Sequence, residues 1–161
     1  MTKIRYLLIA WLLATCLSVI PLPTGADGEA TVRLLSIEGP VTPAMISYFE
    51  RGIAEAEQAG DRAVIIQLNT PGGQVDLTLE IIQNLRAAQV PVVVYIAPRG
   101  AQAASAGTLI TLAAHAAVMA PETVIGAASP IGLGQELSDT EERKAKEDLK
   151  ATIRSLAERR G

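Results

Sequence analysis

Two segments of small residues hold the groups in this chain that could do chemistry. The first is Asn69-Thr70-Pro71-Gly72-Gly73, which follows a continuous apolar run. Tandem glycines let the backbone approach a ligand closely and turn its N–H groups toward a developing negative charge. The same residues also suit a plain turn into a helix. The segment therefore predicts either an oxyanion-binding loop or a simple turn.

The second segment is Ala103-Ala104-Ser105-Ala106-Gly107-Thr108, in which Ser105 stands between small residues. At the start of a helix, the Ser105 hydroxyl would be exposed in the positive field of the helix N-terminus, with room for a substrate backbone. Serine is also a common N-cap residue. The residues alone leave Ser105 open as a nucleophile or as a helix cap.

A nucleophilic serine needs a base, and His115 is the only histidine in the chain. Along one continuous helix, the ten residues that separate His115 from Ser105 correspond to about 15 Å. We therefore expect His115 to lie at the end of that helix and to interact with the helix dipole and solvent. This spacing disfavours a Ser-His-Asp triad.

Lysine is the alternative base, because burial lowers its pKa whereas arginine stays protonated. Between Thr31 and Arg143 the chain has arginines but no lysine, and the later lysines are Lys144, Lys146 and Lys150. A helical wheel brings Lys146 closer than Lys144 to the apolar side of the last predicted helix. Lys144 lies nearer the positive helix end, which favours its neutral form.

The elements that must hold these segments alternate along the chain between β-rich runs and apolar residues at helical spacing. The predicted strands are Val32–Ile37, Ala63–Leu68, Val92–Ala97, Ala117–Met119 and Thr123–Ile125. The predicted helices run from Pro43 to Gly60, from Val75 to Leu85 and from about Ala103 to Ala114. This order predicts an α/β fold with right-handed βαβ units and helices packed on a parallel sheet. Ligands then gather beyond the carboxyl ends of the strands.

The last 26 residues, 136–161, carry seven acids and seven bases. Ser138 and Glu141 have the spacing of a capping box. Leu149, Ile153 and Leu156 follow as an apolar stripe at helical spacing. The pattern predicts a helix with one buried side and a solvated charged face.

The amino-acid composition excludes several other classes of function. The 161 residues are 49% hydrophobic and 19% charged, with a formal net charge of −3, which fits one domain. The charges are too few for binding driven by nucleic-acid phosphates, and 3% aromatic residues disfavour base-stacking surfaces. One cysteine and one histidine exclude a zinc cluster, an intramolecular disulfide and a two-cysteine redox motif.

Residues 1–30 have the pattern of a targeting segment. Lys3 and Arg5 precede an apolar run from Leu7 to Ile20, and small residues follow. The run of about 14 residues predicts a secretory signal peptide, cleaved after Ala26, with an uncleaved membrane anchor as the alternative. We treat Cys16 as an apolar residue of this segment. The remainder is then exported, to a periplasmic or extracytoplasmic location.

Three motifs in combination resemble the NfeD-like (nodulation efficiency protein D) membrane-associated serine proteases of the ClpP/crotonase-type fold, which are encoded beside stomatin-like proteins. They are the Asn-Thr-Pro-Gly-Gly loop after a strand, Ala-Ala-Ser-Ala-Gly-Thr and Val-Ile-Gly-Ala-Ala-Ser-Pro. The resemblance runs from about Val32 to Gly161 and implies that Ser105 is the nucleophile. It also implies that Lys144, which opens a Lys-x-x-x-Asp segment ending at Asp148, is the base.

The resemblance implies further features of the site and its partners. Gly73 and Ala106, with Gly72 beside them, would form the oxyanion and substrate-binding site. The substrate would be a hydrophobic peptide, such as a segment of a stomatin-like protein, and no metal or organic cofactor would be needed. Membrane association and at least a dimer are implied. Members of the family continue with another helix and strand, so we expect the protease domain, residues 31–161, to be incomplete at its C-terminus.

Two other functions remain open from the sequence. A non-catalytic partner of a membrane scaffold could hold peptides in the same groove. A crotonase-like enzyme acting on acyl-CoA would share the fold and the oxyanion-binding device, although the export signal argues against it.

Overall fold

The computed structural model describes residues 30–128 and 138–159. Its elements, in chain order, are β1 (Val32–Glu38), α2 (Pro43–Ala59), β2 (Ala63–Asn69), α3 (Val75–Ala87), β3 (Val92–Ile96), β4 (Gln102–Ala104), α4 (Ala106–Ala113), β5 (Ala116–Met119), β6 (Val124–Gly126) and α5 (Asp139–Glu158). Four of the strands form a parallel sheet in the order β1-β2-β3-β5, and β4 pairs in parallel with β6. The predicted α/β architecture with a parallel sheet is confirmed.

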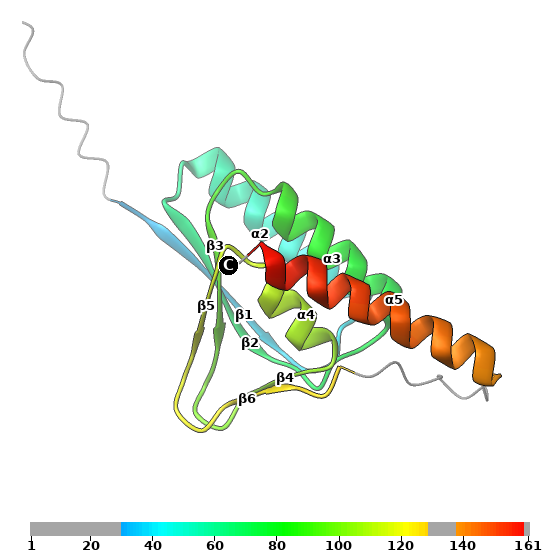
Figure 1. Cartoon of the computed structure of the whole chain (residues 1–161). Helices are drawn as coiled ribbons and strands as arrows, with labels where there is room; N and C mark the ends of the chain where they lie inside the picture. The colour runs from blue at the N-terminus through cyan, green and yellow to red at the C-terminus, as the bar shows by residue number, and fades with distance from the viewer. Residues whose placement is uncertain (1–29, 129–137, 160–161) are drawn as a thin grey trace, which may run out of the picture.

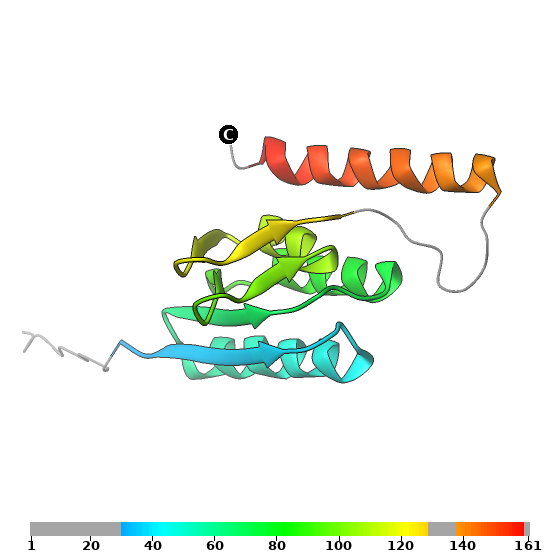
Figure 2. The ribbon, with the colours of Figure 1, turned by 90° about the horizontal axis from the view of Figure 1, so that it is seen from below.

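The helices α2, α3 and α4 lie on one face of the four-stranded sheet, and α5 lies over α4 and α3 (Figures 1 and 2). The core between sheet and helices is apolar. Its fully buried members include Phe49, Ile66, Ile81, Ile96 and Ile110. This core fixes the carboxyl ends of β2 and β3, from which both chemically unusual segments leave the sheet.

The ends of α2 and α5 follow the predicted capping rules. The Thr42 hydroxyl accepts a hydrogen bond from the Met45 amide, and Gly60 ends α2 in the left-handed conformation at φ 73°. At α5, Ser138 and Glu141 form the predicted capping box. The stripe on α5 packs on Ile82 and Leu109, and its members are Leu149, Ile153 and Leu156.

The third predicted helix begins too early. Residues 102–104 form β4, with Ala103 opposite Ile125 and Ala104 opposite Gly126 in the β4–β6 pair. Alanine favours a helix locally, but pairing with a strand about twenty residues later overrides that propensity. Helix α4 therefore begins at Ala106, directly after Ser105.

The predicted N-terminal targeting segment, Cys16 included, lies outside the described residues. Within residues 30–128 and 138–159, no helix is both long enough and apolar enough to cross a bilayer.

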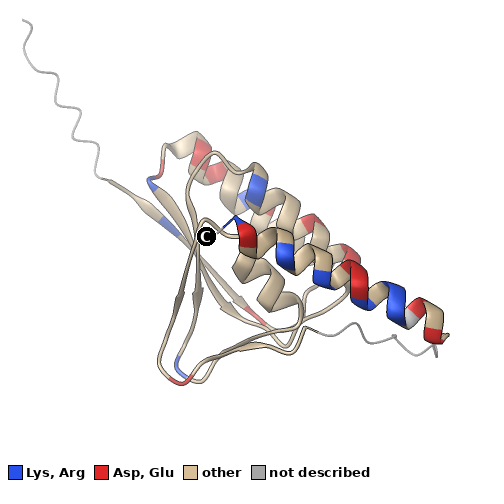
Figure 3. Cartoon of the chain, in the orientation of Figure 1, with Lys and Arg blue, Asp and Glu red and all other residues tan. Residues whose placement is uncertain are grey.

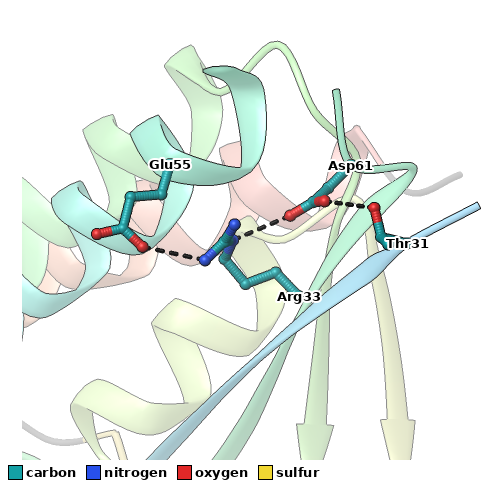
Figure 4. A network of polar contacts seen from close by, with 4 residues as sticks. All are labelled: Thr31, Arg33, Glu55 and Asp61. Atoms are coloured by element: carbon teal, nitrogen blue, oxygen red, sulfur yellow. Dashed lines mark hydrogen bonds and ion pairs between the residues drawn. The ribbon is translucent and has the colours of Figure 1, made fainter. Parts of the chain in front are cut away.

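A polar network ties the start of β1 to the end of α2 (Figure 4). The Thr31 hydroxyl donates to Asp61 Oδ1 at 2.6 Å, and Arg33 Nε donates to Asp61 Oδ2 at 2.9 Å. Arg33 Nη1 also reaches Glu55 Oε2 at 3.0 Å. The Thr31 hydrogen bond, followed by that of Arg33 and its charge, lowers the pKa of Asp61, whose side chain is 6% exposed.

This network predicts an acid-sensitive contribution to stability. Because the pKa of Asp61 is lowered in the folded chain, its stabilisation is present above the unfolded pKa of about 3.9 and is lost as the pH falls through the folded value. The Asp61→Asn variant should lack this contribution, so its Tm should fall less than the parental Tm between pH 5 and pH 3.

Thermal unfolding followed by circular dichroism across that pH range measures the effect. The matched control is Glu158→Gln, since Glu158 makes no hydrogen bond or ion pair with any described residue. An acid-induced fall in Tm as steep in Asp61→Asn as in the parental chain would contradict the assignment.

Candidate active site

Ser105 sits at the junction of β4 and α4 in a conformation that is rare for a residue with a side chain. Its φ is 51° and its ψ is −112°. Such strained backbone is held only where the surroundings fix it, and such residues cluster at functional sites. The Ser105 amide donates to the carbonyl of Gly126 at 2.8 Å, and the Ser105 carbonyl accepts from the amide of Thr108 at 3.0 Å.

The Ser105 hydroxyl makes no hydrogen bond that would stabilise the described part of the fold. Ser105 occupies the N-cap position of α4, but its side chain makes no capping hydrogen bond. The hydroxyl has no other hydrogen-bond partner among residues 30–128 and 138–159. The simple role of a capping serine, which the sequence left open, therefore does not describe Ser105. What remains is a half-buried, unpaired hydroxyl at the positive end of a helix.

Gly72 is pressed directly against Ser105. A Cβ atom built on Gly72 would lie 2.7 Å from Ser105 Cβ and 3.2 Å from the Ala106 amide nitrogen. Gly72 also has a φ of 111°, which side chains rarely allow. The structure thus brings Gly72, Ser105 and Ala106 together at one point, beyond the carboxyl ends of β2 and β3.

The backbone amides around Ser105 differ in what they bind. The Gly72 amide donates to the Thr70 hydroxyl at 3.1 Å. The amides of Gly73 and Ala106 have no hydrogen-bond partner in the described part of the chain. Unpaired N–H groups are the kind of donor that an oxyanion-binding site uses. Gly72 instead lets the backbone of the glycine loop lie close to Ser105.

Thr70 is the residue of the first loop whose importance the sequence reasoning missed. Its side chain is fully buried, and its hydroxyl fixes Gly72. Its backbone amide donates to Gln102 at 2.7 Å, and its carbonyl accepts from Ala104 at 3.0 Å. Thr70 thereby joins the glycine loop to the strand that leads to Ser105. The sequence signal that could have found it is a threonine that follows an apolar run and stands two residues before Gly72.

A small cavity of about 20 Å³ opens beside Ser105. Its walls are mainly apolar or small, and α5 contributes one of them. The lining residues are Gly73, Val75, Thr78, Ser105, Ala106, Leu109, Ala128 and Leu149. Neither β4, α4 nor β6 carries a charged residue, whereas charges follow α5 along its length (Figure 3). The surroundings of Ser105 therefore favour an apolar group.

Both candidate bases lie on the first turns of α5 and are exposed. Lys144 makes no hydrogen bond with Ser105. Leu149, five residues after Lys144 and three after Lys146, is the α5 residue that lines the cavity. Helical geometry places residues three apart on one face and residues five apart about 140° around the axis. The structure thus brings neither lysine to the serine and leaves Lys146 nearer the face that carries Leu149.

The N-terminal end of α5 is held by a carboxylate. The Ser138 hydroxyl donates to Glu141 at 2.7 Å and the Ser138 amide at 3.0 Å. These hydrogen bonds lower the pKa of Glu141, so its negative charge persists at the positive helix end. Glu141 is one turn before Lys144 and fixes the start of the helix that carries it.

His115 lies beyond the far end of α4 from Ser105. Its Nδ1 accepts a hydrogen bond from the Val92 amide at 3.1 Å, and its own amide donates to the Val92 carbonyl at 3.0 Å. The eight residues of α4 separate it from Ser105, about 12 Å along the axis. His115 therefore lies directly before β5, hydrogen-bonded to the start of β3, and takes no part in this site. Among the described residues, no three His, Cys, Asp or Glu side chains gather where they could hold a metal ion.

Two curated relatives match most of this chain. The membrane-bound protease PH1510 of Pyrococcus horikoshii is 42% identical over 132 residues, which is 81% of this chain and 30% of that protein. Membrane protein NfeD1b of Bacillus subtilis is 32% identical over 114 residues, 70% of this chain and 25% of that protein. The chain thus spans less than a third of the length of either relative.

Solved structures show the same fold. Two are mutants of the 1510-N membrane-bound stomatin-specific protease, one serine-to-alanine and one lysine-to-alanine, the latter in complex with a substrate peptide. Each has a TM-score of 0.72 and 38% identity and covers 80% of this chain, which spans 63% and 59% of those chains. ClpP1 from Listeria monocytogenes, 23% identical with a TM-score of 0.63 over 77% of this chain and 71% of its own, shows the ClpP-like fold alone.

These similarities agree with a match between this chain and a family profile. The sequence profile described as "NfeD1b, N-terminal domain" matches residues 31–161. The match includes the glycine loop, the segment around Ser105 and the whole of α5. The chain belongs to the NfeD1b N-terminal domain family and has a ClpP-like fold.

Proposed function

We propose that this chain forms the catalytic domain of an exported, membrane-associated serine endopeptidase in which Ser105 and Lys144 act as a dyad. The observation that carries the proposal is the unpaired hydroxyl of Ser105, held on strained backbone against Gly72 at the N-terminus of α4. The names of the solved relatives add support, since a serine and a lysine of that stomatin-specific protease were each replaced by alanine.

The first half of the reaction forms an acyl-enzyme. Neutral Lys144 takes the proton of the Ser105 hydroxyl as Ser105 Oγ bonds to the carbonyl carbon of the peptide. The carbonyl electron pair moves onto oxygen, where the unpaired amides of Gly73 and Ala106 donate to it. Protonated Lys144 then gives its proton to the leaving amine as the C–N bond breaks.

The second half reverses these roles with water. Lys144 takes a proton from a water molecule, whose oxygen attacks the acyl carbon. The second oxyanion collapses, the bond to Ser105 Oγ breaks, and Ser105 recovers its proton from Lys144. Since Lys144 is exposed and unpaired with Ser105 in the free chain, substrate binding or assembly must bring α5 and Ser105 closer. Catalytic contacts often tighten only in the substrate complex.

The proposed substrate is a hydrophobic segment of a stomatin-like protein. The small cavity beside Ser105 has apolar walls from Val75, Leu109 and Leu149, so a peptide that reaches Ser105 meets no charged side chain there. A solved relative is named for its specificity toward stomatin. The basic and apolar pattern of the N-terminal residues supports a location of the domain outside the cytoplasm. The proposal also includes assembly into at least a dimer.

Replacing the two candidate bases one at a time tests the dyad. Lys144→Ala should lower kcat for a hydrophobic peptide about 10²–10⁴-fold, the usual contribution of a general base. The matched control is Lys146→Ala, two residues further along the same exposed helix, whose kcat should stay close to the parental value. Chromatographic quantification of the cleaved peptide gives both rates.

The pattern of loss identifies the base. Parental rates in both variants would contradict a Ser-Lys dyad. A large loss confined to Lys146→Ala would transfer the role to Lys146 and contradict the assignment of Lys144.

A further inference from the structure

The hydroxyl of Thr108 stands at the point where three segments around Ser105 meet. It lies 2.8 Å from the Gly126 carbonyl and 3.0 Å from the Ala103 carbonyl, to either of which it can donate its proton. It also accepts a hydrogen bond from the Gly126 amide at 3.0 Å. Ala103 belongs to β4, Gly126 ends β6, and Thr108 itself lies in the first turn of α4.

Gly126 is in turn the residue that holds the Ser105 amide. The Gly126 carbonyl accepts from Ser105 at 2.8 Å as well as facing the Thr108 hydroxyl. On its other side, Ser105 is held by the Thr108 amide, which donates to its carbonyl at 3.0 Å. Both backbone bonds of Ser105 therefore involve Thr108, one directly and one through Gly126.

Thr108 differs from the other hydroxyl residue of α4. The Thr111 hydroxyl donates to the Gly107 carbonyl at 2.7 Å, an ordinary bond to the preceding helical turn. The Thr108 hydroxyl bonds instead to two residues outside the helix. The Thr111 bond stays within α4, whereas the Thr108 bonds fix the start of the helix relative to β4 and β6.

We propose that Thr108 is a positioning residue for the proposed reaction: its hydroxyl locks Gly126 and thereby holds Ser105 in its strained conformation. A residue at φ 51° relaxes toward common backbone conformations unless its neighbours prevent it. Loss of the hydrogen bonds of the Thr108 hydroxyl would let Ser105 Oγ move away from the Gly73 and Ala106 amides. The inference rests on the proposed function of Ser105.

The test compares variants that differ only in the hydroxyl. Thr108→Val keeps the shape of the side chain and should lower kcat about 10²-fold with little change in KM, as expected when a reacting group is misplaced by about 1 Å. Thr108→Ser restores the hydroxyl and should restore kcat. Thr111→Val, one turn later on α4, should keep the parental kcat. If Thr108→Val folds poorly, Thr108→Ser and Thr108→Ala form a second pair that differs in the hydroxyl.

Two further readouts separate this inference from the proposed function. Covalent labelling of Ser105 by a fluorophosphonate should slow in Thr108→Val in step with kcat. Hydrogen exchange of the Ser105 amide, which needs no activity, should accelerate in Thr108→Val but not in Thr111→Val. Unchanged exchange, or an equal loss of kcat in Thr108→Ser, would overturn the role of Thr108. A parental chain that is not labelled at Ser105 would overturn the proposed function, and amide exchange would still decide the role of Thr108.

Discussion

Peptide hydrolysis by the Ser105→Ala variant is expected to fall at least about 10³-fold, because the group that forms the acyl-enzyme is removed. The variant should nevertheless fold normally. Alanine keeps the Cβ atom, and the hydroxyl that it removes makes no hydrogen bond with any described residue. We expect a change in unfolding free energy within about 0.5 kcal/mol. Peptide cleavage and thermal unfolding, measured on the same preparation, check both expectations.

The matched control for this substitution is Ser155→Ala. Ser155 is exposed on α5, so its loss should change neither cleavage nor unfolding. The combination expected for Ser105→Ala, activity lost with stability kept, is typical of a catalytic group rather than a structural one. Cleavage at the parental rate would show that Ser105 is not the nucleophile.

Gly72→Ala should strongly reduce the rate of hydrolysis for a steric reason. The new Cβ would stand 2.7 Å from Ser105 Cβ and 3.1 Å from the Ala104 carbonyl oxygen, so the loop and Ser105 cannot both keep their places. The φ of 111° adds strain of about 1–3 kcal/mol. We expect a kcat reduced about 10²-fold or more, since the displacement is comparable to 1 Å, together with a lower Tm.

Gly39→Ala separates the two causes. Gly39 has nearly the same φ, 107°, but nothing lies within 4 Å of the Cβ that it would gain. Its stability should fall through backbone strain alone, while its kcat should remain close to the parental value. Equal losses of activity in Gly39→Ala and Gly72→Ala would mean that strain, and not contact with Ser105, causes the effect. The same pair of Tm measurements controls for partial unfolding.

Local patterns were sufficient to predict most of the fold. The apolar run before Asn69 became β2, an inner strand of the sheet in which alternate residues are buried. Thr42 and Gly60 stand at the two ends of α2, as expected of a capping threonine and a terminating glycine. The Ser138–Glu141 capping box opened α5. These features depend on residues close together in the sequence, where propensity and periodicity act directly.

The sequence could not predict the features that depend on distant partners. β4 exists because Ala103 pairs with Ile125, and the strained backbone of Ser105 is fixed by Gly126, twenty-one residues later. The sequence placed Ser105 at a helix start but could not exclude a capping role, which only the unused hydroxyl does. It grouped Gly72 with the oxyanion donors, whereas the Gly72 amide is bound by Thr70.

The choice between Lys144 and Lys146 as the base also depends on contacts between distant parts of the chain. Lys144 and Lys146 are two residues apart on an exposed helical turn, and their distances to Ser105 depend on how α5 packs over α4. That packing is set by Leu156 and its neighbours at the other end of the helix. Family resemblance favours Lys144, while the helix face that carries Leu149 favours Lys146.

The most direct measurement of the central claim is the site at which a fluorophosphonate reacts, mapped by mass spectrometry of the purified chain. A nucleophilic Ser105 should carry one adduct per chain, and a hydrophobic peptide should compete with the reagent. If the chain binds peptide without any adduct on Ser105, or cleaves peptide with the adduct on another residue, Ser105 is not a catalytic nucleophile. The first of these outcomes would make the domain a peptide-binding partner instead.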